Sequence, residues 1–151
     1  MSDVSFQELK PPPRILLGPG PSNISPRVQM AMTQPMLGHM DPYFTTIVAD
    51  AVKLLRFLFR TENEITFPIS ATGMAGMDAS FNNFLESGDV VVIGVNGFFG
   101  ERMVDIASRC GAEVVRLDVE WGRIVESEAI EAALKSRKRV KLLALVHTET
   151  S

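Results

Sequence analysis

The sequence has little of several residue types on which specialised proteins depend. Cys110 is its single cysteine, so no disulfide can form within the chain, and this composition fits a reducing compartment. Its two histidines, His39 and His147, have no second ligand at metal-binding spacing beyond a nearby Asp41 and Glu149, which are common by chance. We therefore expect neither a disulfide framework nor a metal site.

Long apolar runs and a strong net charge are also missing. No stretch reaches the roughly 18 apolar residues that a membrane span needs, and the first residues have neither the charged nor the apolar part of a signal peptide. Fifteen basic and eighteen acidic residues leave a formal charge of −3, which gives no reason to expect binding to nucleic acid or to anionic membranes. The composition predicts a soluble, cytoplasmic protein, and a peroxisomal location stays open.

The N-terminal segment, residues 1–23, is rich in proline and glycine. Such density forbids a regular helix and favours an extended path. Because Leu16 and Leu17 are apolar, we expect this arm to lie on the body of the protein or on a partner subunit. The arm residues that set this pattern are Pro11, Pro12, Pro13, Gly18, Pro19, Gly20 and Pro21.

The remainder, residues 24–151, has the composition of one globular domain or part of one, with 46% hydrophobic and 22% charged residues in the whole chain. Ser25-Pro26 and Asp41-Pro42 are typical helix starts, and the second opens a long helix to about residue 60 that we expect to be well buried. An alternating pattern follows, and it predicts a mostly parallel sheet with helices on both faces. The expected strands are 64–70, 89–95, 113–118 and 140–147, and the expected helices are 74–86, 98–110 and 127–136.

Ligands of such sheets bind beyond the carboxyl ends of the strands, which directs attention to three loops. Residues 70–74 turn from a strand into a helix through small residues, so their N–H groups favour an anion such as phosphate, although a simple capped connection fits the same local pattern. Residues 96–100 add two aromatic rings, and residues 147–151 add hydroxyl groups. Together the three loops suit a flat, phosphorylated aromatic ligand.

The glycines of residues 94–100 resemble a dinucleotide fingerprint, with Asp118 about twenty residues further on. Their spacing is wrong, and Phe98 and Phe99 stand where a pyrophosphate must approach the backbone. We therefore do not expect a nicotinamide or flavin site. The glycines are interpreted as turn residues that orient the two rings, either over a pocket or into the core, and His147 as a core or supporting residue.

Lysine is the residue that a phosphorylated aromatic aldehyde needs for an imine, and none here is suitably placed. Lys10 lies in the arm and Lys53 in the long helix. Lys135 and Lys138 belong to a basic surface cluster. Lys141 begins the last strand, roughly 23 Å from the ligand edge.

Four motifs stand out along the chain. They are Leu16-Leu17-Gly18-Pro19-Gly20-Pro21-Ser22-Asn23, Ser70-Ala71-Thr72-Gly73-Met74, Asn96-Gly97-Phe98-Phe99-Gly100-Glu101-Arg102 and His147-Thr148-Glu149-Thr150-Ser151. In this order they resemble the N-terminal part of the class V, fold-type I pyridoxal-phosphate aminotransferases, and the resemblance extends from about Leu16 to the end. The most similar subgroup is the alanine–glyoxylate, serine–glyoxylate and ureidoglycine–glyoxylate aminotransferases.

The resemblance implies roles for particular residues. Pyridoxal 5'-phosphate would bind through its phosphate to Thr72, Gly73 and Met74. The ring of Phe99 would stack on the pyridine, at a position where many relatives have Trp or Tyr, and Thr150 would approach the phenolic oxygen.

The arm would cross onto the other subunit of a homodimer, and Pro19 and Gly20 would line the substrate pocket. The complete enzyme would move an amino group from alanine, serine or ureidoglycine to glyoxylate or pyruvate.

The relatives are several hundred residues long, and they place the lysine and its partner groups after the motif that ends at Ser151. We therefore expect this chain to be a fragment that cannot transaminate by itself. Two other interpretations stay open at this point: a cysteine desulfurase or other lyase of the same fold, and a non-catalytic oligomerisation module.

Overall fold

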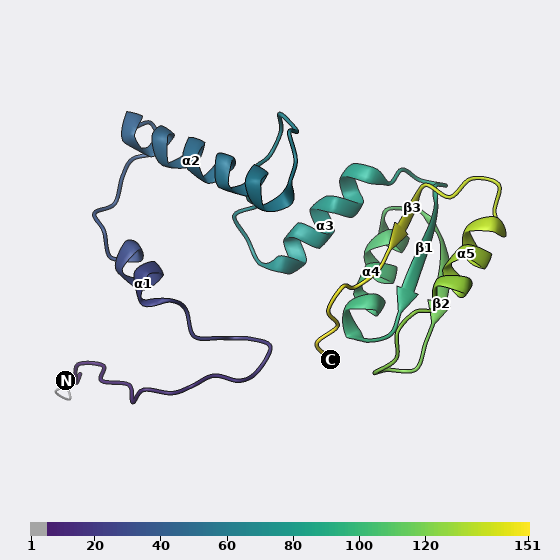
Figure 1. Ribbon diagram of the computed structural model, residues 1–151, viewed down its shortest axis with the longest axis horizontal. Coiled ribbons are helices and arrows are strands. Elements are labelled where there is room, and N and C mark those ends of the chain that lie inside the picture. Colours follow the sequence, from purple (N-terminus) through teal and green to yellow (C-terminus); the bar gives the residue numbers. More distant parts are fainter. Residues whose placement is uncertain (1–5) are drawn as a thin grey trace, which may run out of the picture. The chain divides into compact units, whose positions relative to one another are not determined.

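The computed structural model describes residues 6–151. The chain divides into two compact units, Met1–Leu54 and Leu55–Ser151, and the division falls within helix α2 (Pro42–Phe59). No helix in the described residues is long and apolar enough to cross a membrane. The elements are labelled in Figure 1.

In the first unit, irregular backbone leads into helix α1 (Pro26–Met32). Asn23 ties the arm to itself, because its Oδ1 accepts a 2.7 Å hydrogen bond from the Leu16 N–H and its Nδ2 donates to the Arg14 carbonyl over 3.0 Å. Ser25 precedes the helix and its carbonyl accepts from the N–H of Val28 over 2.9 Å. The predicted start of this helix is confirmed.

Helix α2 also begins where Asp41-Pro42 predicts, and Asp41 Oδ1 accepts a 2.8 Å hydrogen bond from the Tyr43 N–H. The expected burial is wrong, because α2 has no buried residue and side chains such as Phe57 and Leu58 are exposed. A helical repeat of apolar residues reports that one face is apolar, but it does not report what covers that face.

The strand predicted at residues 64–70 does not form, and the backbone there is irregular. Side chains bind the carbonyls where this segment begins. The Arg56 guanidinium donates to the carbonyls of Asn63 and Glu64 over 3.0 and 2.6 Å, and Thr66 Oγ1 donates to Asn63 over 2.9 Å.

The sheet of the second unit consists of β1 (Val90–Val95), β2 (Glu113–Asp118) and β3 (Leu142–Ala144) in the order β2-β1-β3. Both pairings are parallel, and Val92 lies beside Val115 on one side and Leu143 on the other. Two of the strands match their predicted ranges closely. The third is shorter than the expected 140–147, because the chain leaves the sheet after Ala144.

Three helices accompany the sheet: α3 (Gly73–Phe84), α4 (Phe98–Arg109) and α5 (Ser127–Lys135). The connections through α4 and α5 run in opposite directions across the sheet, so right-handed crossovers place these two helices on opposite faces, as Figure 1 shows. The predicted α/β fold with helices on both faces is confirmed.

The core lies between the sheet and the α3/α4 layer. Val91, Ile93 and Val95 alternate along β1 and meet Met103 and Ile106 of α4. Ile93 and Ile106 are essentially inaccessible to solvent. This core fixes α4 on β1, and with it the loop that joins them.

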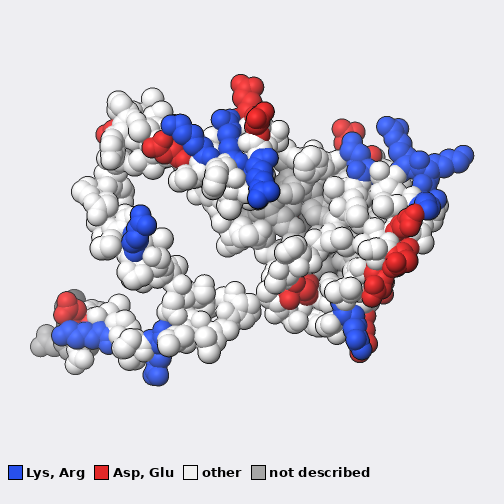
Figure 2. All heavy atoms as spheres, viewed as in Figure 1, with Lys and Arg blue, Asp and Glu red and all other residues white. Residues whose placement is uncertain are grey.

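Cations and anions are interspersed over much of the surface seen in Figure 2. The basic residues at the end of helix α5 and after it are exposed, as predicted: Lys135, Arg137, Lys138, Arg139 and Lys141.

Candidate functional site

The N-termini of α3 and α4 lie at the edge of the sheet where the strands end. Helix α3 leads into the beginning of β1, and α4 follows the end of β1, so both helices start at the carboxyl edge (Figure 1). Two sets of N-terminal N–H groups therefore face one side of the domain, where ligands of parallel sheets bind.

The N-terminus of α3 is open. Thr72 is the N-cap residue, with an extended backbone, and its carbonyl accepts from the N–H of Ala75 over 3.0 Å. Its hydroxyl makes no capping bond, and within residues 6–151 the N–H groups of Gly73 and Met74 have no partner. A Cβ added at Gly73 would have nothing within 4 Å. Unpaired donors beside free space form a site that fits a phosphate group.

Anchoring on the core gives this turn a fixed position. Thr72 and Gly73 are exposed, whereas the side chain of Met74 packs against the core between the sheet and the α3/α4 layer. Phe81, about two helical turns further along the same face, is buried in the same core. The open N-terminus is thus held by the domain and does not depend on a bound ligand for its place.

The N-terminus of α4 is already filled by the chain itself. Glu149 Oε2 accepts hydrogen bonds from the N–H groups of Phe99 and Gly100, over 3.0 and 3.3 Å. Ser151 Oγ accepts a 2.9 Å bond from the N–H of Phe98. The first three donors of α4 therefore have partners.

The second oxygen of Glu149 binds the segment from which it comes. Oε1 accepts from the N–H groups of Thr150 and Ser151, over 3.0 and 3.3 Å, and from the Ser151 hydroxyl over 3.0 Å. Burial, the largest single influence, favours the neutral acid, but the hydrogen bonds from Ser151, Gly100 and Phe99 together lower the pKa of Glu149. The group is held as a carboxylate.

Gly97 makes this approach possible. A Cβ at that position would collide with Cγ and Cδ of Glu149 and with Oγ of Ser151. Within residues 94–100, the N–H groups of Phe99 and Gly100 are therefore already bound. The carboxylate of Glu149 occupies the position in which a pyrophosphate would accept hydrogen bonds from the same N–H groups.

Two aromatic rings begin α4. Phe98 and Phe99 meet edge to face, with ring centroids 5.4 Å apart and planes at 86°. The guanidinium carbon of Arg102 lies 5.0 Å from the centroid of Phe98. Phe98 is exposed and Phe99 half-buried, so neither ring is a fully buried core residue.

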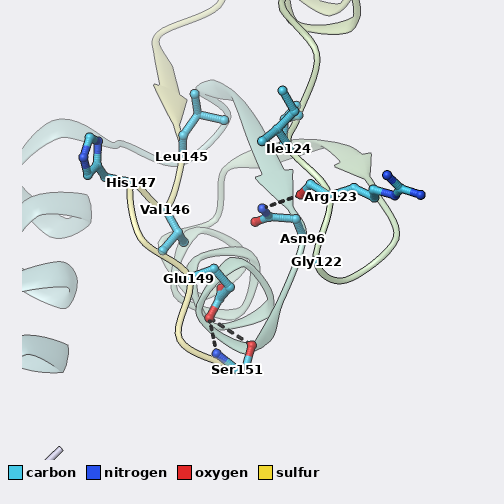
Figure 3. Close-up of a pocket in the computed structure, with 10 residues that line it drawn as sticks. Asn96, Gly122, Arg123, Ile124, Leu145, Val146, His147, Glu149 and Ser151 are labelled. Atoms are coloured by element: carbon cyan, nitrogen blue, oxygen red, sulfur yellow. Dashed lines mark hydrogen bonds between the residues drawn. The ribbon is translucent and has the colours of Figure 1, made fainter. Parts of the chain in front are cut away.

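A cleft of about 330 Å³ opens beside the ends of β1 and β3. Asn96 borders it and donates from Nδ2 to the carbonyl of Arg123 over 3.0 Å, while Glu149 and Ser151 form another part of its wall (Figure 3). His147 is exposed and its ring points away from the other labelled side chains, so its assignment as a core residue is wrong. The early end of β3 leaves it outside the sheet.

An ion-pair group stands near the same edge. Arg116 contacts both Glu101 and Asp118, and hydrogen bonding to Arg116 lowers the pKa of Asp118 against the opposing effect of burial. Asp118, which the dinucleotide pattern singled out, is thus engaged by a neighbouring cation.

The residues predicted to bind a ligand lie in both units. Thr72, Gly73, Met74, Phe99 and Thr150 belong to the second unit, and the first four lie at the N-termini of α3 and α4 at the ligand edge. The exposed Thr150 is attached through its N–H to Glu149. Pro19 and Gly20 are exposed residues of the first unit, and their role remains a prediction.

Lys141 lies where the sequence places it, at the edge opposite the ligand loops. It precedes β3, and its N–H donates to the carbonyl of Val90 over 2.8 Å.

Sequence reasoning assigns Glu149 no role of its own, although the structure places its carboxylate at the N-terminus of α4. One signal in the sequence could have indicated this contact. An acidic residue follows one predicted strand, and a helix begins directly after a neighbouring strand at the same edge, where its N-terminus favours an anion.

The whole chain matches known proteins. It is 40% identical over 145 residues to the (S)-ureidoglycine–glyoxylate transaminase of Bacillus subtilis, which covers 96% of this chain and 35% of that protein. It is 41% identical over 127 residues to an alanine–glyoxylate aminotransferase of Drosophila melanogaster, covering 84% of this chain and 32% of the relative. No family model matches.

Solved structures give the same result. The crystal structure of an alanine–glyoxylate aminotransferase from a Nostoc species superposes with a TM-score of 0.90 at 44% identity, covering 98% of this chain and 39% of the other. The ureidoglycine–glyoxylate aminotransferase of Bacillus subtilis gives 0.89 at 40% identity, covering 96% and 37%. The chain thus spans about a third of the length of the proteins it matches, from 32% to 39%.

Proposed function

We propose that this chain, which belongs to the class V, fold-type I aminotransferases, forms the phosphate end and one ring face of a pyridoxal 5'-phosphate site. The complete protein then transfers an amino group from a small amino acid, such as alanine, serine or ureidoglycine, to glyoxylate or pyruvate. The named relatives favour this activity over the lyase and oligomerisation alternatives.

The contrast between two helix N-termini carries the proposal. Both begin at the ligand edge, but Glu149 fills that of α4, whereas the N–H groups of Gly73 and Met74 are unpaired within the described residues. A dianionic phosphate is stabilised by such donors and by the positive end of the helix dipole. Thr72 adds an exposed hydroxyl at the same turn. The phosphate therefore binds at α3.

The remaining groups hold the aromatic part of the cofactor. Pyridoxal phosphate, when bound, supplies an electron sink for charge that develops at the substrate Cα. Phe99 would stack on the cofactor ring and exclude water from it, and the Thr150 hydroxyl would donate to the phenolic oxygen. The half-buried setting of Phe99 supports the first assignment, because the residue is neither enclosed in the core nor fully exposed to water.

The first unit supplies the substrate side. Pro19 and Gly20 are exposed in the arm, where Asn23 holds the backbone of residues 14–23 in a loop. A preformed, exposed loop can insert beside the cofactor of a second subunit, so the enzyme is proposed to be a homodimer. The lysine that carries the cofactor is proposed to lie in a segment of the full enzyme other than this chain.

The test is amino transfer by the full-length protein. Purified enzyme supplied with pyridoxal phosphate is mixed with glyoxylate and alanine, serine or ureidoglycine in turn, and glycine is measured. We expect glycine to form with at least one donor and the enzyme to show absorbance of a lysine-bound cofactor, whereas the cofactor-free protein serves as the blank. The proposal would be refuted if the enzyme showed no absorbance of a lysine-bound cofactor and formed no glycine with any of the three donors.

A further inference from the structure

We propose that Glu149 is a positioning residue of the cofactor site, which joins the loop that carries Phe99 to the segment that carries Thr150. This inference deepens the proposed function and rests on it, because Phe99 and Thr150 are the residues assigned to the cofactor ring. Glu149 itself is not assigned a contact with the cofactor.

The two oxygens of one carboxylate divide between the two segments. Oε2 accepts from Phe99 and Gly100 at the start of α4, and Oε1 accepts from Thr150 and Ser151. The link between Glu149 and Ser151 is drawn in Figure 3. These segments are about fifty residues apart in sequence. A single rigid group of this size therefore fixes the backbone of one relative to the backbone of the other.

Ser151 supports the same connection. Its hydroxyl donates to Glu149 Oε1 over 3.0 Å and accepts from the Phe98 N–H over 2.9 Å. Gly97 leaves the space into which the carboxylate fits. The contact thus has a matched shape, a second hydrogen-bonded link and satisfied acceptors on both oxygens, which distinguish it from an incidental surface cap.

Position matters here because the two ring contacts must be made at once. A stacking ring and a hydroxyl donor on separate loops cooperate only if their separation matches the cofactor, and small displacements lower both affinity and rate. The ionised state suits the task, since the hydrogen bonds lower the pKa of Glu149 and a carboxylate accepts from both segments.

The first readout is amide hydrogen exchange in the cofactor-free, full-length protein. In Glu149→Ala the N–H groups of Phe99 and Gly100 lose their acceptor, so peptides covering 96–102 should exchange faster than in the wild type. Asp89→Asn is the matched control, because Asp89 Oδ2 also accepts a backbone N–H, from Glu86 over 3.0 Å, but at the amino edge of the sheet. The control should leave exchange at 96–102 unchanged.

The second readout is the dissociation constant of pyridoxal phosphate, measured by absorbance titration. Losing charge-assisted hydrogen bonds that orient both ring contacts should weaken binding about tenfold in Glu149→Ala. Glu149→Gln keeps one acceptor and should fall between the wild type and the alanine variant. Asp89→Asn should bind as the wild type does.

Should Glu149→Ala fail to fold, Ser151→Ala provides the same two readouts, because it retains the carboxylate and loses the bridge to Phe98. Unchanged exchange at 96–102, or faster exchange with unchanged cofactor affinity, would overturn the inference, the latter showing a cap that serves stability alone. If the wild type takes up no cofactor, the proposed function itself fails and the positioning role falls with it. If the wild type binds the cofactor and Glu149→Ala binds it equally well, only the positioning role is refuted.

Discussion

Arg116 and Glu101 form a two-point contact, in which Nη1 donates to Oε2 over 3.1 Å and Nη2 donates to Oε1 over 2.7 Å. The same guanidinium donates to Asp118 Oδ1 over 2.6 Å. Because Glu101 lies in the first turn of α4 and Arg116 in β2, the group attaches the start of the helix to the neighbouring strand. It thereby supports the backbone that presents Phe98 and Phe99.

Arg116→Ala should lower the free energy of unfolding by about 1 kcal/mol, a small value because the side chains are partly exposed to solvent. Denaturant unfolding measures it, and added salt should reduce the difference from the wild type. Arg109→Ala, which removes the more exposed pair with Asp105, is the control and should cost less.

Acid should abolish part of the effect of Arg116→Ala. The hydrogen bond from Arg116 lowers the pKa of Asp118 below its ordinary value of 3.8. A carboxyl whose folded pKa is depressed stabilises the protein above its unfolded pKa and loses that contribution as the pH falls through the folded pKa. The difference between wild type and variant should therefore be constant near neutrality and shrink below pH 3.8; a difference that grows on acidification would contradict the assignment.

Gly100→Ala should destabilise the protein by about 1–3 kcal/mol, because overpacking at a tight contact forces the backbone apart. Its Cβ would lie 2.9 Å from Cα of Val95 and 3.0 Å from the carbonyl oxygen of Gly94, and neither backbone atom can rotate away. Thermal and denaturant unfolding test this. Gly76→Ala is the matched control within helix α3, where an added Cβ has nothing within 4 Å.

The control should be neutral or stabilising, since alanine favours a helix by up to about 1 kcal/mol over glycine. Equal destabilisation by both changes would show that the close approach of α4 to β1 does not explain the glycine at 100.

Thr72→Ala should weaken cofactor binding about tenfold and leave the unfolding free energy of the cofactor-free protein nearly unchanged. The hydroxyl makes no capping bond in the described structure, so its loss costs a charge-assisted bond to phosphate and little else. Ser80→Ala on the same helix, where Oγ donates to the Gly76 carbonyl, should bind normally. Loss of stability without loss of affinity would indicate a capping role for Thr72.

Phe99→Leu should raise the cofactor dissociation constant several-fold, because stacked aromatic pairs contribute about 0.5–1.5 kcal/mol beyond their buried area. Phe98→Leu removes the edge-to-face neighbour and retains the stacking ring, so its effect should be smaller. Phe99→Trp should restore the affinity. If Phe98→Leu and Phe99→Leu both bound the cofactor with the dissociation constant of the wild type, neither ring would contact the cofactor.

Most of the second unit could be predicted because its signals are local. Continuous apolar runs such as Val90–Val95 identify buried parallel strands, and the helices that follow have regular apolar faces. The free N-terminus of α3 also follows from a local pattern, in which small residues at 70–74 precede a helix.

The rest depends on side-chain contacts and surroundings that an apolar pattern does not contain. Residues 64–70 have the apolar pattern of a strand, but the structure has irregular backbone there, with Arg56 and Thr66 bound to the carbonyl of the preceding Asn63. Helix α2 has the apolar repeat of a buried helix and no buried residue. Glu149 reaches α4 through a loop path and a side-chain conformation that no local pattern specifies.

The hydrogen bond from the Phe99 N–H to Glu149 also predicts an order of assembly for the fold. Helix α4 follows β1 directly, but two of its N-terminal donors bind an acceptor about fifty residues downstream, beyond β3. Contacts between such distant residues form slowly, since chain entropy is lost before they are made. We therefore expect the start of α4 to be among the last regions of this unit to reach its native contacts, so that its protection reports completion of the sheet.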